Sequence, residues 1–95
     1  MLPNDVSNRA YDTSPYEATI LIYGFDLFDK PRQVHPMLHL KNVSMDTAKR
    51  RATAKAKSLG LTARQRHWVN LRENFSKREY QTENGARRLI VVERS

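Results

Sequence analysis

Apolar residues recur at intervals of three and four between residues 44 and 61, which is the spacing of one helix face. Ser44 precedes this pattern as a good N-cap residue, and Gly60 stands where a left-handed residue often ends a helix. We therefore predict a helix over residues 44–59. Its apolar face consists of Met45, Ala48, Ala52, Ala56 and Leu59. Because most of these side chains are small, we expect a neighbouring layer to approach the helix closely.

Alternating apolar residues predict two strands before this helix. Residues 16–28 alternate most clearly, and both faces of that strand are apolar. One face carries Ala18, Ile20 and Ile22, and the other carries Leu21, Tyr23 and Phe25. We expect a central strand whose second face is also covered. A turn over residues 29–32 leads into a second strand over residues 33–41, and Pro36 places that strand at a sheet edge.

Three further strands are predicted after the helix. Residues 63–75 alternate as a third strand. Asn84-Gly85 favours a two-residue type I′ hairpin turn, because that turn needs positive φ at both central residues. The turn joins a fourth strand over residues 77–83 to a fifth over residues 86–94, and in this register Tyr80 faces Leu89.

The resulting order is ββαβββ, in which one amphipathic helix must cover one face of a mostly antiparallel sheet. This is a two-layer α+β arrangement. We expect a single domain over residues 16–95. Residues 1–15 are rich in polar residues and proline, which is typical of a mobile arm. The expected core is Ala18, Ile20, Ile22, Leu38, Leu40, Met45, Ala48, Ala52, Ala56, Leu59, Val69, Leu71, Leu89 and Val91.

The charge is strongly positive and unevenly distributed. The chain carries 17 Lys and Arg against 10 Asp and Glu, a net charge of +7. Residues 30–95 hold 16 bases and 5 acids (net +11), whereas residues 1–29 hold 1 base and 5 acids (net −4). Such a concentration of positive charge indicates a polyanionic partner. The competing interpretation is that the charge only keeps an ordinary domain soluble.

A candidate nucleic-acid surface follows from the third strand. Its alternation places Arg64, Arg66, Trp68 and Arg72 on one face. Guanidinium groups bind phosphates in pairs of hydrogen bonds, and an exposed indole stacks on an unpaired base. The helix bases Lys49, Arg50 and Lys57 and the strand residue Arg88 widen this surface. We therefore expect non-catalytic binding of DNA or RNA, with a weak preference for single strands.

Trp68 has a second interpretation that the pattern leaves open. A lone tryptophan in a small domain is often a core residue, and in that case the strand is turned over and Val69 and Leu71 are exposed. The alternative function is protein interaction, as in the small inhibitors and adaptors that phages and plasmids encode. A homodimer partner or another protein would then cover Leu21, Tyr23 and Phe25, or pair with a free sheet edge.

Several classes of chemistry lack support in the sequence. Without cysteine there is no disulfide or thiolate metal site. His35 and His39 are four residues apart, but on a strand that separation is about 13 Å, too far for one metal ion. No nucleophile elbow, glycine-rich phosphate loop or paired carboxylate appears, so we expect no enzyme and no cofactor. The sequence shows no membrane span or secretion signal, which predicts a cytoplasmic protein.

Overall fold

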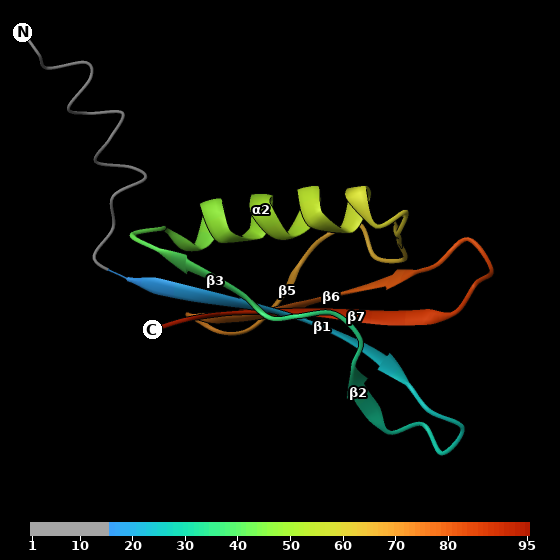
Figure 1. Cartoon of the computed structure of the whole chain (residues 1–95). Helices are drawn as coiled ribbons and strands as arrows, with labels where there is room; N and C mark the ends of the chain where they lie inside the picture. The colour runs from blue at the N-terminus through green and yellow to red at the C-terminus, as the bar shows by residue number, and fades with distance from the viewer. Residues whose placement is uncertain (1–15) are drawn as a thin grey trace, which may run out of the picture.

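The computed structural model describes residues 16–95, which form one antiparallel sheet of seven strands and one helix (Figure 1). The predicted arm over residues 1–15 lies outside the described residues. The helix is α2 (Met45–Ser58). The strands are β1 (Glu17–Phe25), β2 (Pro31–Gln33), β3 (Leu38–Lys41), β4 (Thr62–Ala63), β5 (Val69–Arg72), β6 (Phe75–Gln81) and β7 (Arg87–Arg94). Since α2 covers one face of the sheet, the predicted two-layer α+β domain is confirmed (Figure 1).

Both ends of α2 follow from local sequence signals. The Oγ atom of Ser44 accepts a hydrogen bond from the amide of Thr47 at 3.2 Å, which satisfies one free amide of the first turn. At the other end Gly60 adopts a φ of 75°. The amide of Leu61 then donates to the carbonyl of Ala56 at 2.9 Å, which completes a Schellman motif. The predicted helix boundaries are confirmed.

The core lies between the alanine face of α2 and the two central strands. Ala48, Ala52 and Ala56 are at most 1% exposed. Beneath them lie four fully buried side chains, Ile20 and Ile22 of β1 and Ile90 and Val92 of β7. Because alanine has no side chain beyond Cβ, the helix axis sits close to the sheet, and burial of the branched strand residues provides most of the apolar stabilisation.

β1 and β7 are the central strands in the order β2-β1-β7-β6-β4, with β3 also paired to β1 and β5 to β6. The predicted second strand is broken into β2 and β3, and Pro36 lies in the break.

The predicted turn over residues 29–32 is wrong. The turn instead spans residues 26–29, where the amide of Asp29 donates to the carbonyl of Asp26 at 2.9 Å. Pro31 begins β2, an edge position where no amide donor is needed.

The hairpin between β6 and β7 has a longer loop than predicted, and its register differs by one residue. The amide of Gly85 donates to the carbonyl of Thr82, and Gly85 has a φ of 83°. This geometry is a three-residue loop with glycine in the left-handed position, instead of a type I′ turn. Tyr80 therefore faces Arg88, not Leu89.

A shift of one residue turns every side chain of a strand to the opposite face. Ile90 and Val92 consequently point to the helix and form the core. Leu89 and Val91, both predicted in the core, lie on the helix-free face of the sheet. Val91 is 9% exposed and is buried as predicted, although away from the helix, whereas Leu89 is only half-buried, so the core prediction was wrong for Leu89.

The predicted third strand over residues 63–75 is also wrong as one continuous strand. It is divided into β4 and β5 by a bend over residues 64–68. Arg78 of β6 holds this bend, because its guanidinium donates to the carbonyls of Gln65 and Arg66, both at 3.0 Å. The side chain of Arg78 thus provides these two backbone carbonyls with hydrogen bonds in place of a neighbouring strand.

The bend decides the orientation of Trp68. Trp68 is half-buried and packs against the core, whereas Val69 and Leu71 are 37% and 49% exposed. The assignment of Val69 and Leu71 to the core is therefore wrong, and the alternative interpretation of Trp68 as a core-facing residue is confirmed. No helix within residues 16–95 is long and apolar enough to cross a membrane.

Candidate nucleic-acid interface

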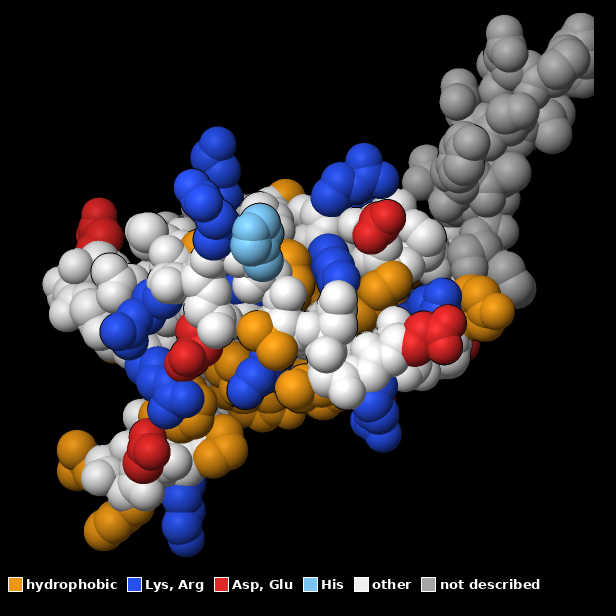
Figure 2. All heavy atoms as spheres, turned by 180° about the vertical axis from the view of Figure 1, so that it is seen from behind, with side chains coloured by type: hydrophobic (Ala, Val, Ile, Leu, Met, Phe, Trp, Pro, Cys, Tyr) orange, Lys and Arg blue, Asp and Glu red, His pale blue; other side chains and the backbone are white. Residues whose placement is uncertain are grey.

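The stretch that contains α2 and the bend is strongly basic. Residues 45–68 hold one acid, Asp46, and seven bases, namely Lys49, Arg50, Arg51, Lys55, Lys57, Arg64 and Arg66. The ion pairs found within residues 16–95 involve none of the bases of α2. Space-filling views show Lys and Arg side chains projecting from the helix side of the molecule (Figure 2). The positive charge of α2 is thus available to an external anion.

An open hollow of about 590 Å³ lies beside α2, with Trp68 on its other side. The remaining lining comes from Ser44, Asp46, Thr47, Lys49, Arg50 and Thr53. Trp68 therefore has two roles in the packing, since part of its ring contacts the core and part borders this hollow. The hollow combines an aromatic wall, two cations, several hydroxyl groups and one carboxylate, that of Asp46. The cations, hydroxyl groups and aromatic ring are groups that bind a phosphate and a neighbouring base.

Lys49 is held at the rim of this hollow. Its Nζ atom donates to Oδ1 of Asn70 at 2.9 Å, and the same oxygen accepts a hydrogen bond from Oγ of the buried Ser76 at 2.6 Å. Asn70 thus positions the ammonium group without neutralising it. Sequence reasoning missed this role of Asn70, because the residue lies 21 positions from Lys49 and no local pattern connects them.

Arg50 lies between two hollows. A second one, of about 450 Å³, is on the other side of the helix. Its lining consists of Lys41, Val43, Thr47, Arg50 and Arg51. Two further bases, Lys41 and Arg51, therefore line the same hollow as Arg50. Neither was predicted from the sequence to belong to the interface. The two hollows thus bring four bases together around the N-terminal half of α2, namely Lys41, Lys49, Arg50 and Arg51.

The other predicted contact residues are dispersed. Lys57 is exposed on the C-terminal half of α2, and Arg64 and Arg66 are exposed in the bend. Arg64 leans toward β6, where its charge contributes to lowering the pKa of Glu79, behind the larger effect of Arg87. These residues extend the basic surface but do not border either hollow.

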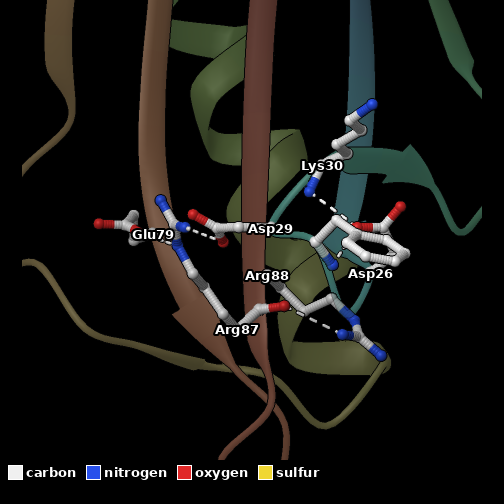
Figure 3. A network of polar contacts seen from close by, with 7 residues as sticks. Asp26, Asp29, Lys30, Glu79, Arg87 and Arg88 are labelled. Carbon is white, nitrogen blue, oxygen red and sulfur yellow. Dashed lines mark hydrogen bonds and ion pairs between the residues drawn. The ribbon is translucent and has the colours of Figure 1, made fainter.

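Arg72 and Arg88 do not join this surface. The Nη2 atom of Arg72 lies 3.9 Å from Oε2 of Glu93, and its guanidinium carbon is 5.0 Å from the ring centroid of Phe75, both on the helix-free face. The guanidinium of Arg88 donates to the carbonyl of Arg87 at 3.0 Å and turns away from the Arg87 network (Figure 3). The predicted row of arginines on one strand face does not form, because the bend breaks the alternation.

The helix-free face carries an apolar block at the centre of the sheet. The block consists of Leu21 and Tyr23 of β1 and Leu89 and Val91 of β7. Leu21 pairs with Val91, and Tyr23 pairs with Leu89. Leu21, Tyr23 and Leu89 are half-buried and Val91 is 9% exposed. Phe25 lies on the same face but is covered, since the guanidinium carbon of Arg87 is 4.0 Å from its ring centroid.

Arg87 joins three elements through two ion pairs (Figure 3). Its Nε atom is 2.6 Å from Oε1 of Glu79, and its Nη1 atom is 3.4 Å from Oδ1 of Asp29. The hydrogen bond with Arg87 lowers the pKa of Glu79, and the same bond raises the pKa of Arg87. This network borders the apolar block.

Metal-ligating side chains do not cluster in the part of the chain that the structure describes. His39 Nε2 lies 3.0 Å from Oε1 of Glu17, but no third ligand joins them, and no group of three His, Asp or Glu side chains within residues 16–95 is arranged to hold a metal ion.

Comparison with models of protein families, curated proteins and solved structures finds no match to this chain. The candidate function therefore depends on the surface itself.

Proposed function

We propose that this protein binds nucleic acid without catalysing a reaction, through the basic side of α2 and the hollow beside Trp68. The observation that carries the proposal is the run of seven bases without an acid over residues 47–66, together with the absence of ion pairs at the bases of α2 among the described residues. Lys and Arg without acidic partners bind phosphates at little cost, because no existing ion pair must first be broken.

Each residue is assigned a contact with phosphate or base according to its position on this surface. Lys49 and Arg50 contact the phosphates next to the hollow, while Lys57 and Arg66 extend the contact along the strand of nucleic acid. Trp68 offers the part of its ring that borders the hollow to an unpaired base, which favours single strands over duplex. Arg72 is excluded because it is paired with Glu93 on the opposite face. The protein acts in the cytoplasm, on DNA or RNA.

The expected affinity is modest and sensitive to salt. Each phosphate contact contributes about 0.9 to the slope of log K against log salt for duplex and about 0.7 for single strands. A surface with about four such contacts gives a dissociation constant in the range of about 10⁻⁴ to 10⁻⁶ M at physiological salt, with little sequence preference.

A titration of labelled single-stranded and double-stranded oligonucleotides at two salt concentrations, followed by tryptophan fluorescence, tests the proposal. We expect quenching of Trp68, the only tryptophan, by single strands. Arg50→Ala should lower the salt slope by about one contact. Arg72→Ala is the matched control, because it makes the same chemical change on the opposite face, and it should leave the slope unchanged.

Two outcomes would refute nucleic-acid binding at this surface. One is the lack of any binding at low salt by a folded protein. The other is a salt slope that Arg50→Ala and Arg72→Ala reduce equally, which would show that only net charge matters.

The apolar block supports a second candidate function, protein interaction. A central block with a charged border has the organisation of a protein–protein interface, which has an apolar centre and a polar rim. If the protein is an adaptor or inhibitor that binds a partner protein through this block, binding should persist at moderate salt and be weakened by Tyr23→Ala. If Tyr23→Ala lowers only the stability of the protein and no partner affinity, this second function is wrong.

A further inference from the structure

The face of the sheet opposite α2 is nearly neutral, in contrast to the helix side. The charged residues that point to this face from β1, β5, β6 and β7 are Glu17, Arg72, Lys77, Glu79, Arg87 and Glu93. They comprise three acids and three bases. Lys41 of β3, which pairs with Glu17, adds a fourth base, and Asp29, which forms an ion pair with Arg87, adds a fourth acid, so the charges sum to zero. Two of the acids already pair with bases of the same face, Glu79 with Arg87 and Glu93 with Arg72.

These charges surround the apolar block of Leu21, Tyr23, Leu89 and Val91. The block lies on β1 and β7, the two central strands of the sheet, so it occupies the middle of the face. Hydrophobic side chains gather along the underside of the molecule, away from the helix (Figure 2). Burying them against a partner would remove apolar surface from water, at about 25 cal/mol per Å².

The hairpin of β1 and β2 extends this apolar surface. It projects beyond the sheet and descends on the side away from α2 (Figure 1). Its turn presents Leu27 and Phe28, which are 101% and 82% exposed. The turn is nevertheless well ordered by hydrogen bonds, since one carboxylate oxygen of Asp26 accepts from the amides of Phe28 and Lys30, both at 2.9 Å. Two large apolar side chains are thus presented in a defined position beside the open face.

We propose that two copies of this chain pair through the helix-free face, with the apolar blocks at the centre and the projecting hairpin tips against the partner copy. The pairing is a two-fold arrangement in which the same surface is used on both subunits. It concerns the apolar face only and does not depend on nucleic-acid binding by the helix side.

Charge distinguishes a second copy from other partners. In a two-fold interface each surface must complement itself, so it needs both signs of charge in balance. The helix-free face meets this condition with four acids and four bases. The helix side does not, because residues 47–66 carry seven bases and no acid and would repel a second copy. A strongly charged heterologous partner would find no matching charge on a face that sums to zero.

The dimer leaves both basic surfaces free. In each chain α2 covers the face that does not pair (Figure 1). The two helices would therefore lie on opposite outer sides of the dimer. A dimer of this kind holds two separate segments of a polyanion. Dimerisation itself should persist at high salt, because its centre is apolar, whereas bridging through nucleic acid would disappear.

Sedimentation of the nuclease-treated full-length chain across a dilution series at high salt tests the pairing. We expect a reversible monomer–dimer equilibrium. Leu89→Lys introduces a charge into the apolar block and should shift the protein to monomer at every concentration in the series. Leu71→Lys is the matched control, because Leu71 is exposed on β5 outside the block and should leave the equilibrium unchanged.

A second measurement uses the unmodified protein, in case Leu89→Lys does not fold. Amide chemical shifts recorded over the same dilution should change for residues of β1, β7 and the turn over residues 26–29, and stay constant for the outer side of α2. A protein that remains monomeric throughout, or shift changes confined to the helix side, would overturn the proposal. Equal dissociation by Leu71→Lys and Leu89→Lys would overturn it as well.

Discussion

The Nζ atom of Lys49 and the Oδ1 atom of Asn70 lie 2.9 Å apart, and this hydrogen bond joins the N-terminal half of α2 to the edge strand β5. Asn70 also accepts from Ser76, whose side chain is buried, so one amide oxygen connects the helix, β5 and β6. The bond keeps a cation next to the hollow that Trp68 borders. Asn70 therefore contributes both to the stability of the fold and to the position of a cation in the candidate site.

Asn70→Ala should reduce stability. The substitution removes the acceptor of Ser76 Oγ, and a buried hydroxyl left without a partner costs about 1–3 kcal/mol. Urea denaturation followed by tryptophan fluorescence measures the loss. Ser76→Ala in the same background removes the orphaned hydroxyl and should recover part of it. If the double variant is no more stable than Asn70→Ala, the shared oxygen is not the cause.

Ala52→Asp should disrupt the contact between α2 and the sheet. Ala52 is fully buried, and burial of a carboxylate among apolar side chains costs several kcal/mol unless the group is protonated. Ala54→Asp is the matched control, because Ala54 is exposed on the same helix. Thermal unfolding should show a large decrease for Ala52→Asp and little change for Ala54→Asp. Equal midpoints in the two variants would contradict the packing of the alanine face.

The turn at the tip of the β1–β2 hairpin should loosen in acid. Hydrogen bonds from the amide of Lys30, and then from the amide of Phe28 and the side chain of Arg32, lower the pKa of Asp26. The folded turn favours the carboxylate, so its contribution to stability is complete above the ordinary aspartate pKa. That contribution is lost as the pH falls through the lowered folded value.

Amide shifts of Phe28 and Lys30 followed during acid titration measure this transition. Their midpoint should lie below the ordinary aspartate pKa. Asp26→Asn keeps an oxygen acceptor and removes the charge, so its turn amides should not titrate in this window. A midpoint at or above the ordinary value in the unmodified protein would show that these bonds do not stabilise the carboxylate.

Gly85→Ala should destabilise the β6–β7 hairpin although space is available. A Cβ atom at residue 85 would meet nothing within 4 Å, but the φ of 83° is disfavoured for residues with a side chain. The left-handed conformation costs about 1–2 kcal/mol for an L-residue. Gly85→Asn should lose less, because asparagine tolerates this conformation better. Equal unfolding free energies for the two variants would argue against backbone strain as the cause.

Much of the fold was predictable because the relevant interactions are local. The ends of α2 depend on Ser44, Gly60 and neighbours within five residues, and these contacts form as the pattern predicts. The alternation of Ala18, Ile20 and Ile22 identified the buried face of β1. Periodicity and capping residues act over a few positions, so the sequence alone determined the helix, the central first strand and the α+β class.

Tertiary contacts decided what local pattern left open. Leu89, Ile90, Val91 and Val92 are all apolar, so only the actual loop length shows that Ile90 and Val92 face the helix. The candidate site depended even more on distant partners. Arg78 holds the bend at residues 65 and 66 from 12 or 13 positions away, and this bend turns Trp68 to the core. Positive charge was evident in the sequence, but which bases share a surface was determined only when α2 and the bend packed on the sheet.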